Sequence, residues 1–312
     1  MLVKRGDSAL PDLTSGVYVS KQNEDGYGNF SWLNPKGLIK YQTPVVAVIR
    51  FTNEDQLTKL SETYSKTPLP EFLIKILNAE PCLDAELYSR SPSLAKFVSP
   101  IDSTQHGYLI RPNTPYCDTK VLDAYVNAPE TLKNSKHGII LCTYAIHPNI
   151  QGSFLGAHHQ SDIQALKVSH EMPQSDIDRE TKIDSLVSIL NLKQEHLPQL
   201  KKLKKETMQH LRDVYAVNRQ DNIRMFFHFP VAEKTATLHL HTWVNKGDHP
   251  LNEPRSFELD TIIAHLESGR EISSLVLDRN EGSYFLPTSD SIKDIRGIPF
   301  KGVFENTLNL PL

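Results

Sequence analysis

Apolar and polar positions follow regular periods most clearly toward the C-terminal end of the chain. Between residues 195 and 217, leucine, methionine and valine recur largely at spacings of three and four, which predicts a long helix with one apolar face. Pro198 lies in its first turn, where a missing backbone N–H is tolerated. The stretches 222–229 and 237–244 have the composition of strands and are joined by a short turn, which predicts an antiparallel hairpin.

A second amphipathic helix is expected after the hairpin, in the stretch "SFELDTIIAHLESG". It ends at Gly269, a residue type that commonly follows the last turn of a helix. A short helix is also expected over 182–192, before the long one. The apolar stripe of the second amphipathic helix comprises Leu259, Ile262, Ile263 and Leu266.

The first half of the chain has weaker patterns. Residues 44–51 are rich in β-branched side chains and predict a buried strand. Asn53 is a candidate N-cap for the helix that follows, and another helix is expected over 70–80. The stretch 89–136 contains many turn-forming residues and is expected to be loop-rich, whereas 138–146 predicts a further strand.

These patterns predict an α+β protein in four parts. An irregular segment over 1–40 precedes an N-terminal α+β domain over 41–150. A second α+β domain is expected over 151–285, where helix, hairpin and helix follow one another. Residues 286–312 are expected to form a C-terminal extension.

Composition narrows the class of protein. The 312 residues are 39% apolar and 23% charged, which excludes a disordered tail or a membrane protein. The net charge of −3 offers no basic field for long nucleic acid. The basic run "KKLKK" at 201–205 is interpreted as the solvated outer face of the long helix. We therefore expect no long nucleic acid and no membrane among the partners.

Cysteines and the N-terminus indicate the compartment. Cys82, Cys117 and Cys142 are odd in number, widely spaced and form no CxxC pair, which argues against a disulfide framework or a zinc site. The first residues lack the apolar run of a secretory signal. A soluble protein of the cytoplasm is expected.

Histidines stand out in the hairpin. Alternate side chains of a strand share a face, so Thr237, His239, His241 and Trp243 point one way while the leucines between them take the core face. His228 ends the partner strand, and the turn can bring it to the same surface. Two adjacent imidazoles on one strand face call for a functional or structural explanation, because protonating both would place like charges together.

Three interpretations of these histidines compete. The first is an incidental solvated strand face. The second is a metal site, because His-x-His on a strand is good ligand geometry, although no Asp, Glu or Cys supplies an obvious fourth ligand in the hairpin. The third is nucleophilic catalysis, in which one imidazole attacks phosphorus and the others stabilise the phosphate charge.

The quoted stretches "RMFFHFP" and "TLHLHTWV" resemble the signature of the histidine triad superfamily. The wider stretch from roughly 183 to 280 is similar to the C-terminal domain of the scavenger mRNA decapping enzymes. The resemblance implies a histidine-triad-like antiparallel sheet with flanking helices within 151–285. It favours the catalytic interpretation, with no metal and no cofactor expected.

The resemblance also assigns roles to residues. With the interval from His228 setting the register, Thr237 takes the place of the first triad histidine, His239 that of the central nucleophile and His241 that of the third. The other register makes His239 first, His241 the nucleophile and Trp243 third, and it places an indole beside the phosphate. Catalytic roles are therefore expected for His239, His241 and His228.

Substrate contacts are expected around the same strand. Lys234 and Thr235, in the turn, either contact phosphate or belong to a solvated turn. Thr237 is expected at the substrate as well. Lys167 resembles a strand lysine of the decapping family.

The resemblance implies a nucleotide hydrolase that cleaves a phosphoanhydride, in a cap dinucleotide or a dinucleoside polyphosphate, through a nucleotidyl-histidine intermediate. One alternative keeps the chemistry with a nucleoside phosphoramidate or adenylylated adduct as substrate. The other is a nucleotide-binding or interaction module without catalysis, which Thr237 favours. The expected partner is a small nucleotide. A homodimer is also expected, because the histidine triad proteins that the chain resembles are commonly dimers.

Overall fold

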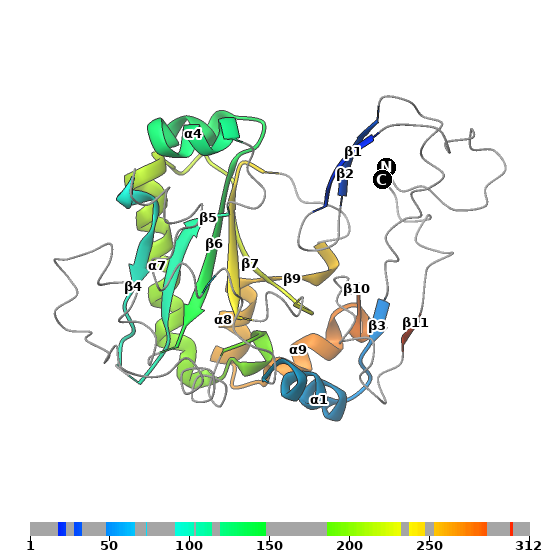
Figure 1. Ribbon diagram of the computed structural model, residues 1–312. Helices are drawn as coiled ribbons and strands as arrows, with labels where there is room; N and C mark the ends of the chain where they lie inside the picture. Colours follow the sequence, from blue (N-terminus) through cyan, green and yellow to red (C-terminus); the bar gives the residue numbers. More distant parts are fainter. Residues whose placement is uncertain are drawn as a thin grey trace, which may run out of the picture.

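The computed structural model describes eleven parts of the chain (Figure 1). They are residues 18–22, 28–32, 48–65, 73, 91–102, 104–113, 119–147, 186–231, 237–246, 253–285 and 300–301.

A six-stranded antiparallel sheet forms the centre of the described structure, in the order β4-β5-β6-β8-β7-β9. The hairpin β7–β8 was predicted, and its register places Phe226 opposite His241. On the other side β8 pairs with β6, where Cys142 lies opposite His241. The strands are β4 (Lys96–Val98), β5 (Gly107–Pro112), β6 (Ile139–Ile146), β7 (Ile223–His228), β8 (His239–Val244) and β9 (Ser256–Glu258).

Two helices close the core on one face of this sheet (Figure 1). Helix α7 (Leu197–Tyr215) buries Leu200 and Leu203, and α8 (Leu259–Glu267) buries Ile262. These side chains share one apolar core with Leu240 of β8. Removing a leucine-sized side chain from water contributes roughly 1.5–3 kcal/mol, so this face stabilises the fold.

Smaller elements surround the sheet. Strand β3 (Val48–Arg50) pairs with β10 (Ser283–Phe285) and with β11 (Phe300–Lys301), which joins segments from both halves of the sequence. Strands β1 (Tyr18–Gln22) and β2 (Gly28–Trp32) form a separate hairpin. The remaining α-helices described are α1 (Glu54–Ser65), α4 (Thr119–Asn127) and α9 (Ile272–Asp278).

Several predictions are confirmed. The fold is α+β, and the long helix, the hairpin and the strand over 138–146 are present. The Asn53 side chain accepts a hydrogen bond from the Gln56 backbone N–H at 3.1 Å, so it caps α1 as expected. Gly269 follows α8 with a φ of +74°, a left-handed conformation that glycine adopts without strain. The helix expected over 70–80 lies outside the described residues except at Leu73.

Two predictions are wrong. The stretch 89–136 is not loop-rich, because it contains β4, β5 and α4. All six residues of β5 are buried, so the strand lacks the alternation that would have revealed it. The described part of 182–192 forms only a 3₁₀ turn, Ile189–Asn191. Ser188 and Asn191 cap that turn reciprocally, and Leu192 after it is already extended.

The predicted boundary between residues 150 and 151 separates β6 from β8 in sequence. The two strands are nevertheless hydrogen-bonded neighbours in one sheet. Where the chain divides into domains therefore stays a prediction.

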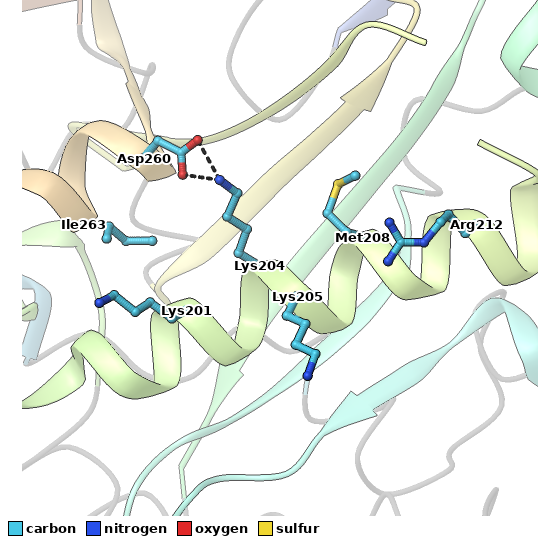
Figure 2. A pocket seen from close by; sticks show the side chains of 7 residues that line it. All are labelled: Lys201, Lys204, Lys205, Met208, Arg212, Asp260 and Ile263. Carbon is cyan, nitrogen blue, oxygen red and sulfur yellow. Dashed lines mark hydrogen bonds and ion pairs between the residues drawn. The ribbon is translucent and has the colours of Figure 1, made fainter. Parts of the chain in front are cut away.

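The basic run at 201–205 lies on the outer side of α7, beside α8. The Lys201 amine pairs with Glu267 at 2.6 Å, and the Lys204 amine contacts both carboxylate oxygens of Asp260 at 2.6 and 2.7 Å. These pairs link the two helices across a shallow groove. Figure 2 shows its lining side chains, Lys201, Lys204, Lys205, Met208, Arg212, Asp260 and Ile263.

Across the described helices, none has the length and hydropathy that a membrane crossing requires.

Candidate histidine site

The face of β8 turned away from α7 and α8 carries His239, His241 and Trp243. The strand sits between β6 and β7, so both of its edges are hydrogen-bonded and its direction is fixed. Leu240, between the two histidines, belongs to the core on the other face, as the alternation predicted. The sheet therefore holds the two imidazoles side by side on a rigid element.

His228 joins them from the end of β7. Its ring centroid lies 4.3 Å from that of His241, and the centroids of His239 and His241 are 5.0 Å apart. Phe226 stacks on His241 with its centroid at 5.4 Å and an interplanar angle of 18°. The structure thus brings the three predicted histidines together, all at least nine-tenths buried.

His239 is oriented by its own strand. Its Nδ1 lies 2.7 Å from the carbonyl oxygen of Thr237. A carbonyl oxygen can only accept, so Nδ1 carries the proton in this hydrogen bond. In the neutral ring the lone pair is then on Nε2, the nitrogen that a nucleophilic histidine needs unprotonated.

His228 and His241 differ from His239 in their surroundings. Within the described residues, both ring nitrogens of each are buried without a hydrogen-bond partner. Leaving a buried polar group unpaired costs about 1–3 kcal/mol, and such groups in a folded protein call for an explanation. Two neighbouring imidazoles with four such nitrogens offer N–H donors to a bound group.

Both of these histidines are held neutral. Burial lowers the pKa of His228 well below its usual value, and the adjacent His241 and the Arg255 guanidinium lower it further. Burial likewise lowers the pKa of His241, followed by the effects of His239 and Arg255. Two neutral imidazoles beside a fixed cation form an environment that favours an anion.

Arg255 is a residue that the sequence analysis missed. It precedes β9 in a 3₁₀ turn, Glu253–Arg255, and is only 1% exposed. Its Nη2 donates to the Pro230 carbonyl at 2.7 Å, and its own carbonyl accepts from the Phe229 N–H at 2.9 Å. No periodic or motif signal marks it, because its proximity to the histidines depends on β9 pairing with β7.

Two more missed residues come from β5 and β6. Tyr144 lies opposite His239 in the sheet, and their ring centroids are 5.7 Å apart. The Arg111 guanidinium lies 5.2 Å from the centroid of the Tyr144 ring and is almost fully buried. A second buried cation is therefore connected to His239 through an aromatic ring.

Trp243 occupies the next position along the histidine face. Its indole packs edge-on against Phe226 at 4.9 Å, and with Ile140 these rings form a small apolar cluster separate from the main core. The Lys246 amine lies 4.9 Å from the centroid of the indole. The tryptophan is thus part of a packed cluster beside His241.

The other predicted contacts have different outcomes. Thr237 is buried, and its hydroxyl donates to the Ala145 carbonyl at 3.4 Å while its carbonyl holds His239. Lys167, Lys234 and Thr235 lie outside the described residues. Among the side chains that the structure describes, no group of three His, Cys, Asp or Glu is placed to hold a metal ion.

Comparison with protein families identifies part of the chain. Residues 180–256 match the family described as "Scavenger mRNA decapping enzyme C-term binding". This segment is therefore a scavenger-decapping-type, histidine-triad-like domain, as the resemblance predicted; it contains α7, β7 and β8, whereas β4, β5 and β6 precede it. A comparison of the chain with curated proteins found no match.

Proposed function

We propose that the decapping-type domain of residues 180–256 makes this chain a nucleotide hydrolase that cleaves a phosphoanhydride bond through a nucleotidyl-histidine intermediate. A domain of this kind suggests nucleotide binding and hydrolysis, and the substrate and the mechanism are our proposal. The small substrate would be a cap dinucleotide or a dinucleoside polyphosphate.

His239 is the proposed nucleophile. Its Nε2 forms a bond to phosphorus while the bond from phosphorus to the bridging oxygen breaks, and the leaving phosphate departs as an anion that needs no proton. Water then attacks the same phosphorus and releases one proton to solvent, while the P–N bond breaks and Nε2 recovers its lone pair. The hydrogen bond from Nδ1 to the Thr237 carbonyl supports this role, because it keeps the lone pair on the attacking nitrogen.

His228 and His241 are the proposed donors to the non-bridging oxygens. Both are neutral and buried, and their ring nitrogens have no hydrogen-bond partner among the described residues, so pairing with a phosphate would break no existing hydrogen bond of either ring. Arg255 adds a fixed positive charge near both. Donors that are already in place where charge develops are among the largest contributors to catalysis.

The orientation of the imidazoles favours one register of the triad. If His241 were the central nucleophile, its Nδ1 would need a holding acceptor, yet neither of its nitrogens has one among the described residues. Trp243 would then take the third place, where its indole packs against Phe226. We therefore assign Thr237, His239 and His241 to the first, second and third positions.

Further contacts complete the proposal. Lys234 and Thr235 precede β8 and would add contacts to the phosphate chain, as would Lys167. The Thr237 carbonyl would contribute indirectly, by orienting the His239 ring.

The single observation that carries the proposal is the pair of unpaired, buried imidazoles beside a histidine whose tautomer is fixed. One observation supports a second candidate, a nucleotide-binding module without catalysis. Thr237 stands where the superfamily has a histidine, and its hydroxyl bonds the Ala145 carbonyl.

Hydrolysis of a nucleotide panel tests the proposal. The panel contains a capped dinucleotide, diadenosine tri- and tetraphosphate and adenosine phosphoramidate, with products separated by chromatography. The wild-type chain should cleave at least one phosphoanhydride, and His239→Asn should lose about three orders of magnitude or more in kcat. Lys205→Gln, on the outer side of α7, is the matched control and should keep wild-type rates.

Other outcomes reject the proposal in distinct ways. Cleavage of the phosphoramidate alone would mean that the enzyme breaks a phosphorus–nitrogen bond of its substrate and not a phosphoanhydride bond, with the same histidine chemistry. Nucleotide binding by the wild-type chain without any turnover would establish the binding module instead.

A further inference from the structure

The start of β8 is held from both sides by backbone hydrogen bonds. The Leu238 N–H donates to the Leu186 carbonyl at 2.7 Å, and the Leu238 carbonyl accepts from the Ala145 N–H at 2.9 Å. Leu238 lies between Thr237, whose carbonyl holds the His239 ring, and His239 itself. Any shift of this backbone would therefore move the acceptor that fixes the His239 tautomer.

One of these two anchors depends on a histidine outside the triad. The Leu186 N–H donates to Nε2 of His106 at 3.3 Å. His106 directly precedes β5, and Gly107 at the start of that strand pairs with Ile146 at the end of β6. The chain of contacts thus runs from His106 through Leu186 to Leu238, and from there to the start of the histidine strand.

The surroundings of His106 keep it in the accepting form. Its ring packs edge-on against His147, with centroids 5.1 Å apart, and it is 9% exposed. Burial, followed by the nearby His147 and His196, lowers the pKa of His106 to about 3. The ring is therefore neutral near pH 7, with the proton on Nδ1 and the lone pair on Nε2 facing the Leu186 N–H.

We propose that His106 is a positioning residue for the nucleophile: through Leu186 and Leu238 it holds the Thr237 carbonyl where it fixes the tautomer of His239. The inference rests on the proposed role of His239. It adds a residue that directly precedes β5, outside the segment that matches the decapping family, to the machinery of the site.

The proposal predicts a specific defect when the acceptor is lost. His106→Phe keeps a planar ring against His147 but has no atom that accepts from Leu186. His106→Gln keeps an acceptor, because its side-chain oxygen reaches approximately the place of Nε2. A small displacement of a reacting group can lower the reaction rate by up to about 10²-fold. His106→Phe should therefore lower kcat by roughly 10- to 100-fold with KM unchanged. His106→Gln should have a kcat close to that of the wild-type chain.

Nitrogen-15 NMR of the His239 ring supplies a readout that a merely structural role would not move. In the wild-type chain and in His106→Gln, the Nδ1–H tautomer should dominate, whereas in His106→Phe the two tautomers should mix. If His106→Phe does not fold, His106→Asn gives the same comparison, because its shorter side chain cannot reach the Leu186 N–H. A wild-type tautomer in a folded chain without the acceptor would overturn the proposal.

The tautomer measurement needs no turnover. If the wild-type chain hydrolyses nothing but His239 shifts tautomer with His106→Phe, the positioning chain stands and the proposed hydrolase fails. If the wild-type chain is active and His106→Phe matches it in kcat and in tautomer, the hydrolase stands and the positioning role fails.

Discussion

Two clusters of ionisable side chains lie on opposite sides of the central sheet, and they differ in exposure and in whether their polar atoms have partners. Lys201, Lys204 and Lys205 lie on the outer side of α7, and the first two pair with carboxylates of α8. His228 and His241 are buried on the other face, with ring nitrogens that have no partner among the described residues. The lysine run, which is the more conspicuous of the two in the sequence, is the cluster that is exposed and joined in ion pairs.

This difference supports the histidine face as the proposed site. An exposed ion pair contributes little to stability and is easily replaced. A buried imidazole without a hydrogen bond costs free energy, and stabilising substitutions at such places commonly cost activity. Helix packing stabilises one face of the sheet, whereas the other bears a cost that a bound phosphate would offset.

The largest effect is expected at the histidine face. His241→Gln should lower kcat by about 10²–10³, the usual loss for a preorganised oxyanion donor. At about pH 7.5 the free energy of unfolding should change by less than about 1 kcal/mol, because the ring nitrogens of His241 give up no hydrogen bond among the described residues. Steady-state kinetics and urea unfolding of the same preparation check both parts. A large loss of stability with normal kcat would contradict the comparison, because His241 would then stabilise the fold and play no part in turnover.

The core face should respond in the opposite way. Leu203, on α7 beside the lysines, is fully buried in the main core. Leu203→Ala should lower the free energy of unfolding by about 2–5 kcal/mol through lost burial and the cavity left behind. Under conditions where the variant stays folded, kcat should remain within about threefold of wild type. Urea unfolding followed by kinetics at low temperature measures both.

The pH dependence of stability should separate the two clusters. Since the pKa values of His228 and His241 are lowered in the folded chain, the unfolded chain binds more protons below about pH 6.5. The free energy of unfolding should therefore be largest above that pH and fall as the pH is lowered, by about 1.4 kcal/mol per pH unit for each such histidine.

Unfolding of wild type and variants between pH 7.5 and 5 tests that slope. His241→Gln should reduce the slope by about 1.4 kcal/mol per pH unit, and His228→Gln with His241→Gln by about twice that. Lys204→Gln should leave the slope unchanged. Equal slopes in all the chains would mean that the two histidines bind protons as readily in the folded chain as in the unfolded one.

The smallest effect is expected in the groove between α7 and α8. Lys204→Gln removes the contact with Asp260 and should change the free energy of unfolding by less than about 1 kcal/mol, with less difference at high salt. Turnover should not change, because the groove lies across the sheet from the histidines. Urea unfolding at low and high salt and the nucleotide assay measure these effects. A loss of turnover would connect the groove to the site.

The sequence was most informative where structure is local. The period of two along residues 237–244 and the short interval from His228 were enough to predict that His228, His239 and His241 share one face. The helical period of α7 likewise depends only on neighbouring residues.

It was least informative where several strands must come together. Arg255, Arg111 and Tyr144 reach the histidines only because β9 and β5–β6 join the sheet on either side of the hairpin. Strand β5 was missed because burial on both faces removes alternation, and Pro112 at its end resembles a turn signal. The orientation of His239 depends on a carbonyl two residues away, which side-chain identity does not reveal.

The central claim is that His239 carries the nucleotide. A single turnover with enzyme in excess over a cleavable dinucleoside polyphosphate, stopped with base because a P–N bond to histidine is labile in acid, would be followed by proteolysis and mass spectrometry. We predict a nucleotidyl group on His239 in the wild-type chain and no adduct in His239→Asn. A nucleotidyl group on His241 would contradict the assigned register, and hydrolysis without any histidine adduct would contradict the mechanism.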